Sequence, residues 1–149
     1  MFFSIGDLAK RTGVKVPTIR YYEARGLLDA PLRSAGNQRR YGQAELERLR
    51  FIRHARDLGF SLGAIFSLIE LQDHPDRSCE TATRIASDQL AAVRDKIGRL
   101  RALEAELSRI TERCTGDGSA RDCYVLASLA DHALCETDHA PAAARGAAL

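Results

Sequence analysis

The sequence has few aromatic residues, no long apolar run and no secretion signal. It has no Trp and only 6% aromatic residues, with 45% hydrophobic residues in a length of 149. No apolar run approaches the roughly 18 residues that cross a bilayer. The N-terminus has no basic segment followed by a cleavage site of small residues. These absences argue against a membrane protein, a secreted disulfide scaffold and a disordered chain. We expect a cytoplasmic protein whose four cysteines are free thiols.

Charge and cysteine are unevenly distributed along the chain. Residues 1–60 hold 12 Lys and Arg against 6 Asp and Glu, whereas residues 61–149 hold 10 against 14. All four cysteines, Cys79, Cys114, Cys123 and Cys135, lie in the acidic part. A basic front part joined to an acidic back part predicts a surface for nucleic acid attached to an element with another task.

The front part is predicted to form short helices with clear starts and stops. A capping box in residues 4–7 and the glycine Gly13 predict a helix near 5–12. Pro17 suits the first turn of a second helix, near 17–25.

A loop and two further helices follow. Residues 29–41 are rich in turn-forming residues and predict a loop or a small β-wing. Apolar residues at helical spacing predict a third helix near 43–57. Ser61 is placed to cap a fourth helix, which His74-Pro75 closes.

A much longer helix is predicted between Cys79 and Cys114, a segment without Pro and with Gly98 as its one Gly. A helix of about 33 residues with a narrow apolar seam requires a partner, so we predict a coiled-coil homodimer. The alternative is packing against its own chain, but the preceding residues are too few to cover the seam. The seam consists of Ala86, Leu90, Val93, Ile97 and Leu100 and, after a slip of one residue, Leu103, Leu107 and Ile110.

Two short helices joined by a Gly-containing turn, followed by a basic wing, predict a winged helix-turn-helix. Its second helix would enter the major groove, while Ile19 and Tyr22 would belong to the core. For any one arginine, an ordinary place on the solvated surface is the alternative. The candidate DNA contacts are Lys15, Thr18, Arg20 and Tyr21 near the second helix, and Arg33, Asn37, Arg39, Arg40 and Tyr41 on the wing.

Six segments carry a more specific signal, in matching order and spacing. They are residues 5–10 (IGDLAK), 18–23 (TIRYYE), 26–28 (GLL), 39–41 (RRY), 51–53 (FIR) and 58–62 (LGFSL). With them, the chain resembles the MerR family of transcription regulators from residue 3 to about residue 130. Arg53 joins the candidate DNA contacts on this ground. A wing position that often carries an aromatic residue in the family is Gln38 here, so this contact is left open.

The resemblance implies a mainly α fold with three parts. Residues 1–75 would form the winged helix-turn-helix domain and connecting helices, 76–113 an antiparallel dimerisation helix, and 114–135 a metal-binding loop and short helix. Residues 136–149 are predicted from their own sequence to form a flexible tail. A homodimer would bind promoter DNA and, on binding its effector, distort the DNA so that RNA polymerase engages both promoter elements. The chain shows no nucleophile–base pair and no Gly-rich phosphate loop, so we do not expect an enzyme.

The residues after the long helix indicate the effector. Only about 35 residues follow Cys114, which is too few for the large pocket of the drug-sensing relatives. The spacing of the cysteines does not match the iron–sulfur cluster of the redox-sensing relatives. Metal sensing is the branch that remains.

Helix length gives a separate reason to expect a metal site between two chains. Cys79 and Cys114 would lie about 52 Å apart at 1.5 Å per residue. An antiparallel partner would bring Cys79 of one chain to Cys114 and Cys123 of the other, which gives two sites per dimer. Three buried apolar cysteines are the alternative, but helix ends and a polar loop argue against it.

The resemblance also bears on the metal. Relatives that sense monovalent copper, silver or gold have a serine where this chain has Cys79, so a third thiolate implies a divalent soft ion: Pb, Cd, Hg or Zn. Zinc would prefer a fourth ligand, which His132, Cys135 or His139 could supply. Three alternatives stay open: a Cu(I)-responsive regulator, a thiol-redox regulator in which Cys114 and Cys123 form a disulfide, and a structural coiled-coil adaptor.

Overall fold

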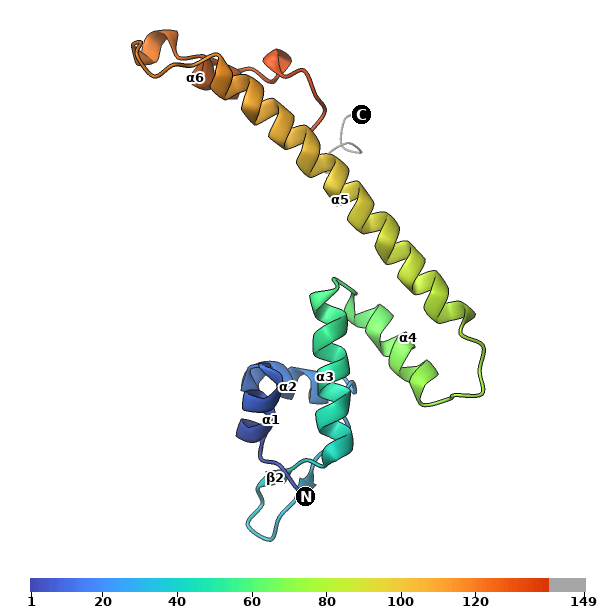
Figure 1. Cartoon of the computed structure of the whole chain (residues 1–149). Coiled ribbons are helices and arrows are strands. Elements are labelled where there is room, and N and C mark those ends of the chain that lie inside the picture. The colour runs from blue at the N-terminus through green and yellow to red at the C-terminus, as the bar shows by residue number, and fades with distance from the viewer. Residues whose placement is uncertain (140–149) are drawn as a thin grey trace. The chain divides into compact units, whose positions relative to one another are not determined.

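The computed structural model describes residues 1–139, which are mainly α-helical with a small two-stranded wing (Figure 1). The chain divides into two units, residues 1–89 and the residues from 90 onward. The predicted fold class is confirmed. The helices are α1 (Ile5–Thr12), α2 (Val16–Ala24), α3 (Gln43–Asp57), α4 (Leu62–Gln72), α5 (Glu80–Glu112) and α6 (Tyr124–Ala130), with 3-10 helices η1 (Ala120–Asp122) and η2 (His132–Leu134).

The short helices begin and end within a residue of their predicted bounds, because local caps fix their ends. The Ser4 side chain accepts a hydrogen bond from the Asp7 N–H, and the Asp7 carboxylate accepts one from the Ser4 N–H. The predicted capping box of α1 is therefore confirmed. Pro17 lies in the first turn of α2, and the Ser61 hydroxyl accepts from the Ala64 N–H at the start of α4.

One apolar core holds the first unit together. Helix α1 packs against both α2 and α3, and Ile19 and Tyr22 of α2 are buried as predicted. The wing consists of the antiparallel strands β1 (Leu32–Arg33) and β2 (Arg39–Arg40). Backbone hydrogen bonds of 2.8 and 3.0 Å between Phe3 and Tyr41 tie the base of the wing to the start of the chain. The fully buried large side chains are Leu8, Ile19, Tyr41, Leu49, Ile52 and Ile65.

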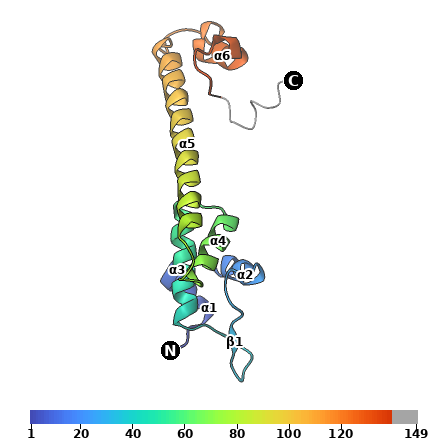
Figure 2. The ribbon, with the colours of Figure 1, turned by 90° about the vertical axis from the view of Figure 1, so that its right-hand side faces the viewer.

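Helix α5 is drawn as one uninterrupted helix (Figure 2). It has 33 residues, and Gly98 lies within it. Its predicted apolar seam is largely uncovered within the described chain. Leu90, Val93, Ile97, Leu100 and Leu107 are between 36% and 61% exposed, whereas Ile110 is buried. Within residues 1–139, no helix is both long and apolar enough to span a membrane.

Two glycines in left-handed backbone conformation give a test of the first unit. Gly59 has φ +86°, and a Cβ there would lie 2.6 Å from Nε2 of Gln89, which donates to the Leu58 carbonyl. Gly26 has φ +74° and open space around it. We expect Gly26→Ala to lower the free energy of unfolding by roughly 1–2 kcal/mol, the cost of a left-handed L-residue. Gly59→Ala should cost more, because it also displaces Gln89.

Urea unfolding followed by circular dichroism measures both costs in the full chain. Equal losses in the two variants would show that the contact between Gln89 and Leu58 adds nothing to stability.

Candidate functional site

Helix α2 and the wing form a basic surface around a shallow hollow of about 360 Å³. Arg20, Arg33 and Arg39 line it, together with Glu23. The Glu23 carboxylate accepts a hydrogen bond from the Tyr41 hydroxyl and pairs with Arg39 Nε at 3.5 Å. Glu23 therefore fixes the wing against α2 and leaves Arg20 and Arg33 exposed.

Most of the predicted DNA contacts are accessible on this surface. Arg33 is braced by a 2.7 Å hydrogen bond from its guanidinium to the Asn37 side chain, and Arg25 lies over the exposed ring of Tyr21 at 5.2 Å. Arg53 donates to the Gly13 carbonyl at 2.9 Å, which secures the end of α1. Exposed are Lys15, Arg20, Tyr21, Arg33, Asn37, Arg40 and Arg53, and half-buried are Thr18 and Arg39.

The prediction that Tyr41 contacts DNA is wrong for the conformation of this structure. Its side chain is fully buried, and its hydroxyl donates to Glu23. Burial, followed by the hydrogen bond to Glu23, raises the pKa of Tyr41 above its usual range. A tyrosine next to two wing arginines looks like a phosphate contact in sequence, but here it closes the core beneath the wing.

The loop after α5 brings two of the predicted metal ligands together. The Sγ atoms of Cys114 and Cys123 lie 3.7 Å apart. Both thiols are half-buried beside a hollow of about 340 Å³ formed by the loop between them. Cys79 is exposed and directly precedes the first residue of α5.

Polar contacts favour the thiolate form of Cys114. The Cys123 thiol, and then the N–H groups of Gly116, Val125 and Tyr124, lower the pKa of Cys114 from its ordinary value. The thiolate is the form of cysteine that binds metals.

An ion pair on α5 holds the segments that carry the cysteines. The Arg109 guanidinium donates to Glu106, to the Tyr124 hydroxyl at 2.6 Å and to the Leu134 carbonyl at 2.7 Å. Tyr124 is the neighbour of Cys123 in sequence, and Leu134 is the neighbour of Cys135. Arg109 therefore connects α5 to both thiol-bearing segments.

The Glu106 carboxylate holds the chain beyond η2. It accepts hydrogen bonds from the N–H groups of Glu136 and Thr137 and from the Thr137 hydroxyl, at 3.1, 3.2 and 2.7 Å. Only 5% of its side chain is exposed. Arg109 and then Thr137 lower the pKa of Glu106 to about 2, so the carboxylate is ionised at neutral pH.

The predicted tail begins at residue 136, but Glu106 holds Glu136 and Thr137 against α5 through hydrogen bonds from their N–H groups. The rest of that predicted tail, residues 140–149, lies outside the described residues. Sequence reasoning also missed Glu106 and Arg109, because a charged pair three residues apart on a helix is usually a solvated surface feature.

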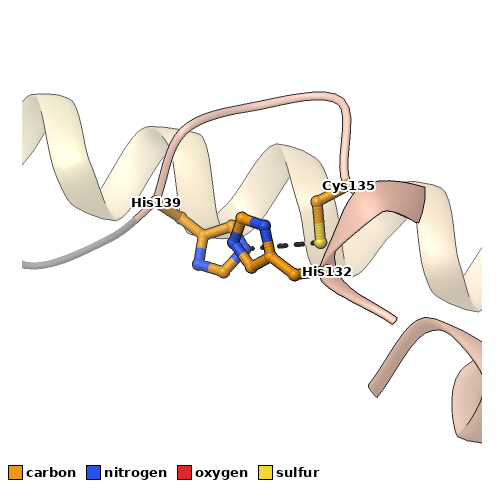
Figure 3. Close-up of side chains that lie close together, drawn as sticks. All are labelled: His132, Cys135 and His139. Carbon is orange, nitrogen blue, oxygen red and sulfur yellow. Dashed lines mark hydrogen bonds between the residues drawn. The ribbon is translucent and has the colours of Figure 1, made fainter. Parts of the chain in front are cut away.

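A second group of possible ligands lies near Glu106. The ligand atoms of His132, Cys135 and His139 are all within 4.8 Å of one another (Figure 3). The Nε2 atom of His139 is 3.4 Å from the Cys135 Sγ. Burial, and then the charge of Glu106, raise the pKa of the Cys135 thiol, in contrast to that of Cys114.

Comparison with known proteins places the chain in a family. Residues 3–71 match the family model described as MerR HTH family regulatory protein, and residues 46–110 match the model described as MerR, DNA binding. The mercuric resistance operon regulatory protein of Pseudomonas fluorescens is 41% identical over 126 residues, which cover 85% of this chain and 86% of that protein. The chain belongs to the MerR family of transcription regulators.

Further relatives place this regulator in the metal-sensing branch of the family. The Escherichia coli regulator ZntR is 36% identical over 129 residues, which cover 85% of this chain and 92% of ZntR. The structure of PbrR691 from Ralstonia metallidurans in complex with lead(II) is similar at a TM-score of 0.74 and 39% identity, over 85% of this chain and 98% of that one. The protein is a DNA-binding transcription regulator and not an enzyme.

The Arg109 contacts predict how the sensor end of the regulator responds to substitution. Arg109→Ala removes the donor to Tyr124 and to Leu134, so amide hydrogens of α6 and η2 should exchange faster by about a factor of ten or more. Hydrogen exchange followed by mass spectrometry measures this change segment by segment.

Arg113→Ala is the matched control, because Arg113 lies over the same Tyr124 ring but has a longer hydrogen bond of 3.4 Å to its hydroxyl. Exchange that rises as much in Arg113→Ala as in Arg109→Ala would contradict the assigned role of Arg109.

Proposed function

We propose that this MerR-family regulator binds promoter DNA as a homodimer and activates transcription when a soft divalent metal ion binds its thiolates. The ligands are Cys79 of one chain and Cys114 and Cys123 of the other, which gives two sites per dimer. The observation that carries the proposal is the pairing of the Cys114 and Cys123 thiols, 3.7 Å apart, just past the end of an uninterrupted α5.

The sulfur–sulfur distance supports a bent rather than a linear site. Two sulfurs that bind the same ion, each at about 2.3 Å, lie about 3.8 Å apart when the S–metal–S angle is tetrahedral. They lie about 4.6 Å apart when that angle is 180°. The observed 3.7 Å fits the bent geometry, which leaves room for further ligands.

The length of α5 supports a third ligand from a second chain. Cys79 directly precedes the helix and Cys114 lies two residues beyond its end, so the two are separated by about 50 Å at the rise of an α-helix. An antiparallel partner would remove that separation. The exposed seam on α5 supports the same partner, because an uncovered apolar stripe on a long helix is typical of a coiled-coil dimer.

The donor set and the relatives favour particular ions. Three thiolates suit large, soft dications, and the similar structures include one in complex with lead(II) and one, MerR from Bacillus megaterium, in complex with mercury(II). We propose Pb²⁺ or Hg²⁺ as effector, ahead of Cd²⁺ and Zn²⁺, because zinc prefers a fourth ligand.

The basic surface of α2 and the wing would hold the DNA. Arg20 and Arg33 are exposed beside the hollow, where they can neutralise phosphates while α2 lies in the major groove. Metal binding at the loop would distort the bound promoter so that RNA polymerase engages both of its elements. A regulator of this kind works in the cytoplasm.

A thiol-redox regulator is the second candidate, and the same 3.7 Å distance favours it, since a small movement would allow a disulfide between Cys114 and Cys123. Transcription from the target promoter, measured with purified protein, separates the two. Metal-sensing requires activation by lead or mercury in the presence of a reductant, whereas redox sensing requires activation by an oxidant without metal.

The DNA-binding surface gives the first test. Arg20→Ala removes one phosphate contact, so binding should weaken and the slope of log K against log salt should fall by about 1. The probe is a duplex selected by the wild-type protein from a random pool. Arg84→Ala, an exposed arginine at the start of α5, is the control and should bind as wild type. An unchanged salt slope in Arg20→Ala would place the DNA elsewhere.

Mixed dimers test whether the ligands come from two chains. Cys79→Ser and Cys114→Ser homodimers should both lose tight lead binding. A mixed dimer purified through two different tags has one intact site, made of Cys79 from the Cys114→Ser chain and of Cys114 and Cys123 from the other. Titration of the thiolate-to-lead absorption should therefore show one site per mixed dimer and two per wild-type dimer.

If all three cysteines of a site came from the same chain, each site of the mixed dimer would lack one cysteine. The mixed dimer would then bind no lead tightly. The control is Cys135→Ser, which should keep two lead sites per dimer because Cys135 is outside the proposed ligand set.

A further inference from the structure

We propose that His132, Cys135 and His139 form a second metal site, separate from the three-cysteine site and suited to a borderline dication such as Zn²⁺. The proposal does not depend on the proposed function. It rests on the convergence of three donors, the anchoring of their backbone and the chemistry of the donor set.

The three donors converge, and one pair of them already has the separation that a bound ion requires. All three ligand atoms are within 4.8 Å of one another, and His139 Nε2 lies 3.4 Å from the Cys135 Sγ (Figure 3). A nitrogen at about 2.0 Å and a sulfur at about 2.3 Å from a tetrahedral zinc are about 3.5 Å apart. The two imidazole rings have centroids 5.1 Å apart, so both can face one ion with small side-chain rotations.

The backbone that carries these donors is fixed on both sides of Cys135. The Leu134 carbonyl accepts from Arg109, and the N–H groups of Glu136 and Thr137 donate to Glu106. The Cys135 N–H donates to the His132 carbonyl at 3.0 Å, which closes the turn between two of the donors. The site is therefore preorganised, and an ion would not have to order the segment first.

There is space for an ion beside the three donors. The three donors and Glu106 border a hollow of about 300 Å³ whose other walls are largely apolar, among them Leu103, Leu107 and Ile110. Three protein ligands in a partly enclosed hollow leave one position of a tetrahedral ion for water.

The donor chemistry differs from that of the three-cysteine site. Two imidazoles and one thiolate suit zinc and its neighbours in the first transition row, whereas three thiolates suit larger soft ions. The hollow at Cys114 and Cys123 and the hollow at Cys135 share no lining residue. Two different ions could therefore bind one chain at the same time.

The test uses the full chain in which the three-cysteine site is removed by Cys79→Ser, Cys114→Ser and Cys123→Ser together. This triple variant should bind one Zn²⁺ per chain. With Co²⁺ as a probe it should show tetrahedral ligand-field bands and the charge-transfer absorption of a single thiolate. Adding Cys135→Ser or His139→Asn should abolish binding, while adding His54→Asn, an exposed histidine of α3, should not. A triple variant that folds, by circular dichroism, and binds no zinc would overturn the proposal.

A second measurement keeps the test decisive if the triple variant does not fold. Equilibrium dialysis of zinc against wild type and Cys135→Ser should show one fewer ion per chain in the variant, and equal numbers would overturn the proposal. Lead absorption separates the two sites. Cys135→Ser should keep the full lead signal, whereas loss of that signal would make Cys135 a ligand of the same ion and refute a separate site.

Discussion

The continuity of α5 is the constraint on which the rest of the molecule depends. A helix of 33 residues has a fixed rise, and the one glycine within it causes no break. Its start belongs to the unit with the basic surface, and its end carries the thiol loop. No rearrangement short of breaking the helix can bring Cys79 to Cys114 in one chain. In the proposed function, one partner would therefore both cover the apolar seam and complete the three-thiol site.

The ion pair of the buried Glu106 and the half-buried Arg109 is the second structural determinant. Charged groups are costly to bury unless each is paired and hydrogen-bonded. Here the cost is offset because the carboxylate and the guanidinium each accept or donate several hydrogen bonds to backbone and side-chain groups of the terminal segment. The segment after α6 is too short to form a large apolar core, and this ion pair on α5 holds it by hydrogen bonds instead.

Sequence reasoning succeeded where structure depends on neighbouring residues. Capping boxes, Pro17 and turn-forming residues gave the helices of the first unit, and a loop of eight residues was enough to expect Cys114 and Cys123 to meet. It failed where structure depends on contacts between distant segments. Phe3 pairs with the backbone of Tyr41, and Glu23 accepts a hydrogen bond from the Tyr41 hydroxyl. Glu136 and Thr137 lie against α5 because Glu106, about 30 residues upstream, accepts hydrogen bonds from their N–H groups. None of these contacts leaves a pattern in a single sequence.

The shared anchor of the two thiol-bearing segments has a thermodynamic consequence. Tyr124, next to Cys123, and Leu134, next to Cys135, both accept hydrogen bonds from one guanidinium. Any displacement of Arg109 by an ion at one site alters the free energy of binding at the other, and linkage requires the effect to be equal in both directions. The affinity of the three-cysteine site for lead or mercury would then depend in part on how much zinc the cell supplies to the second site.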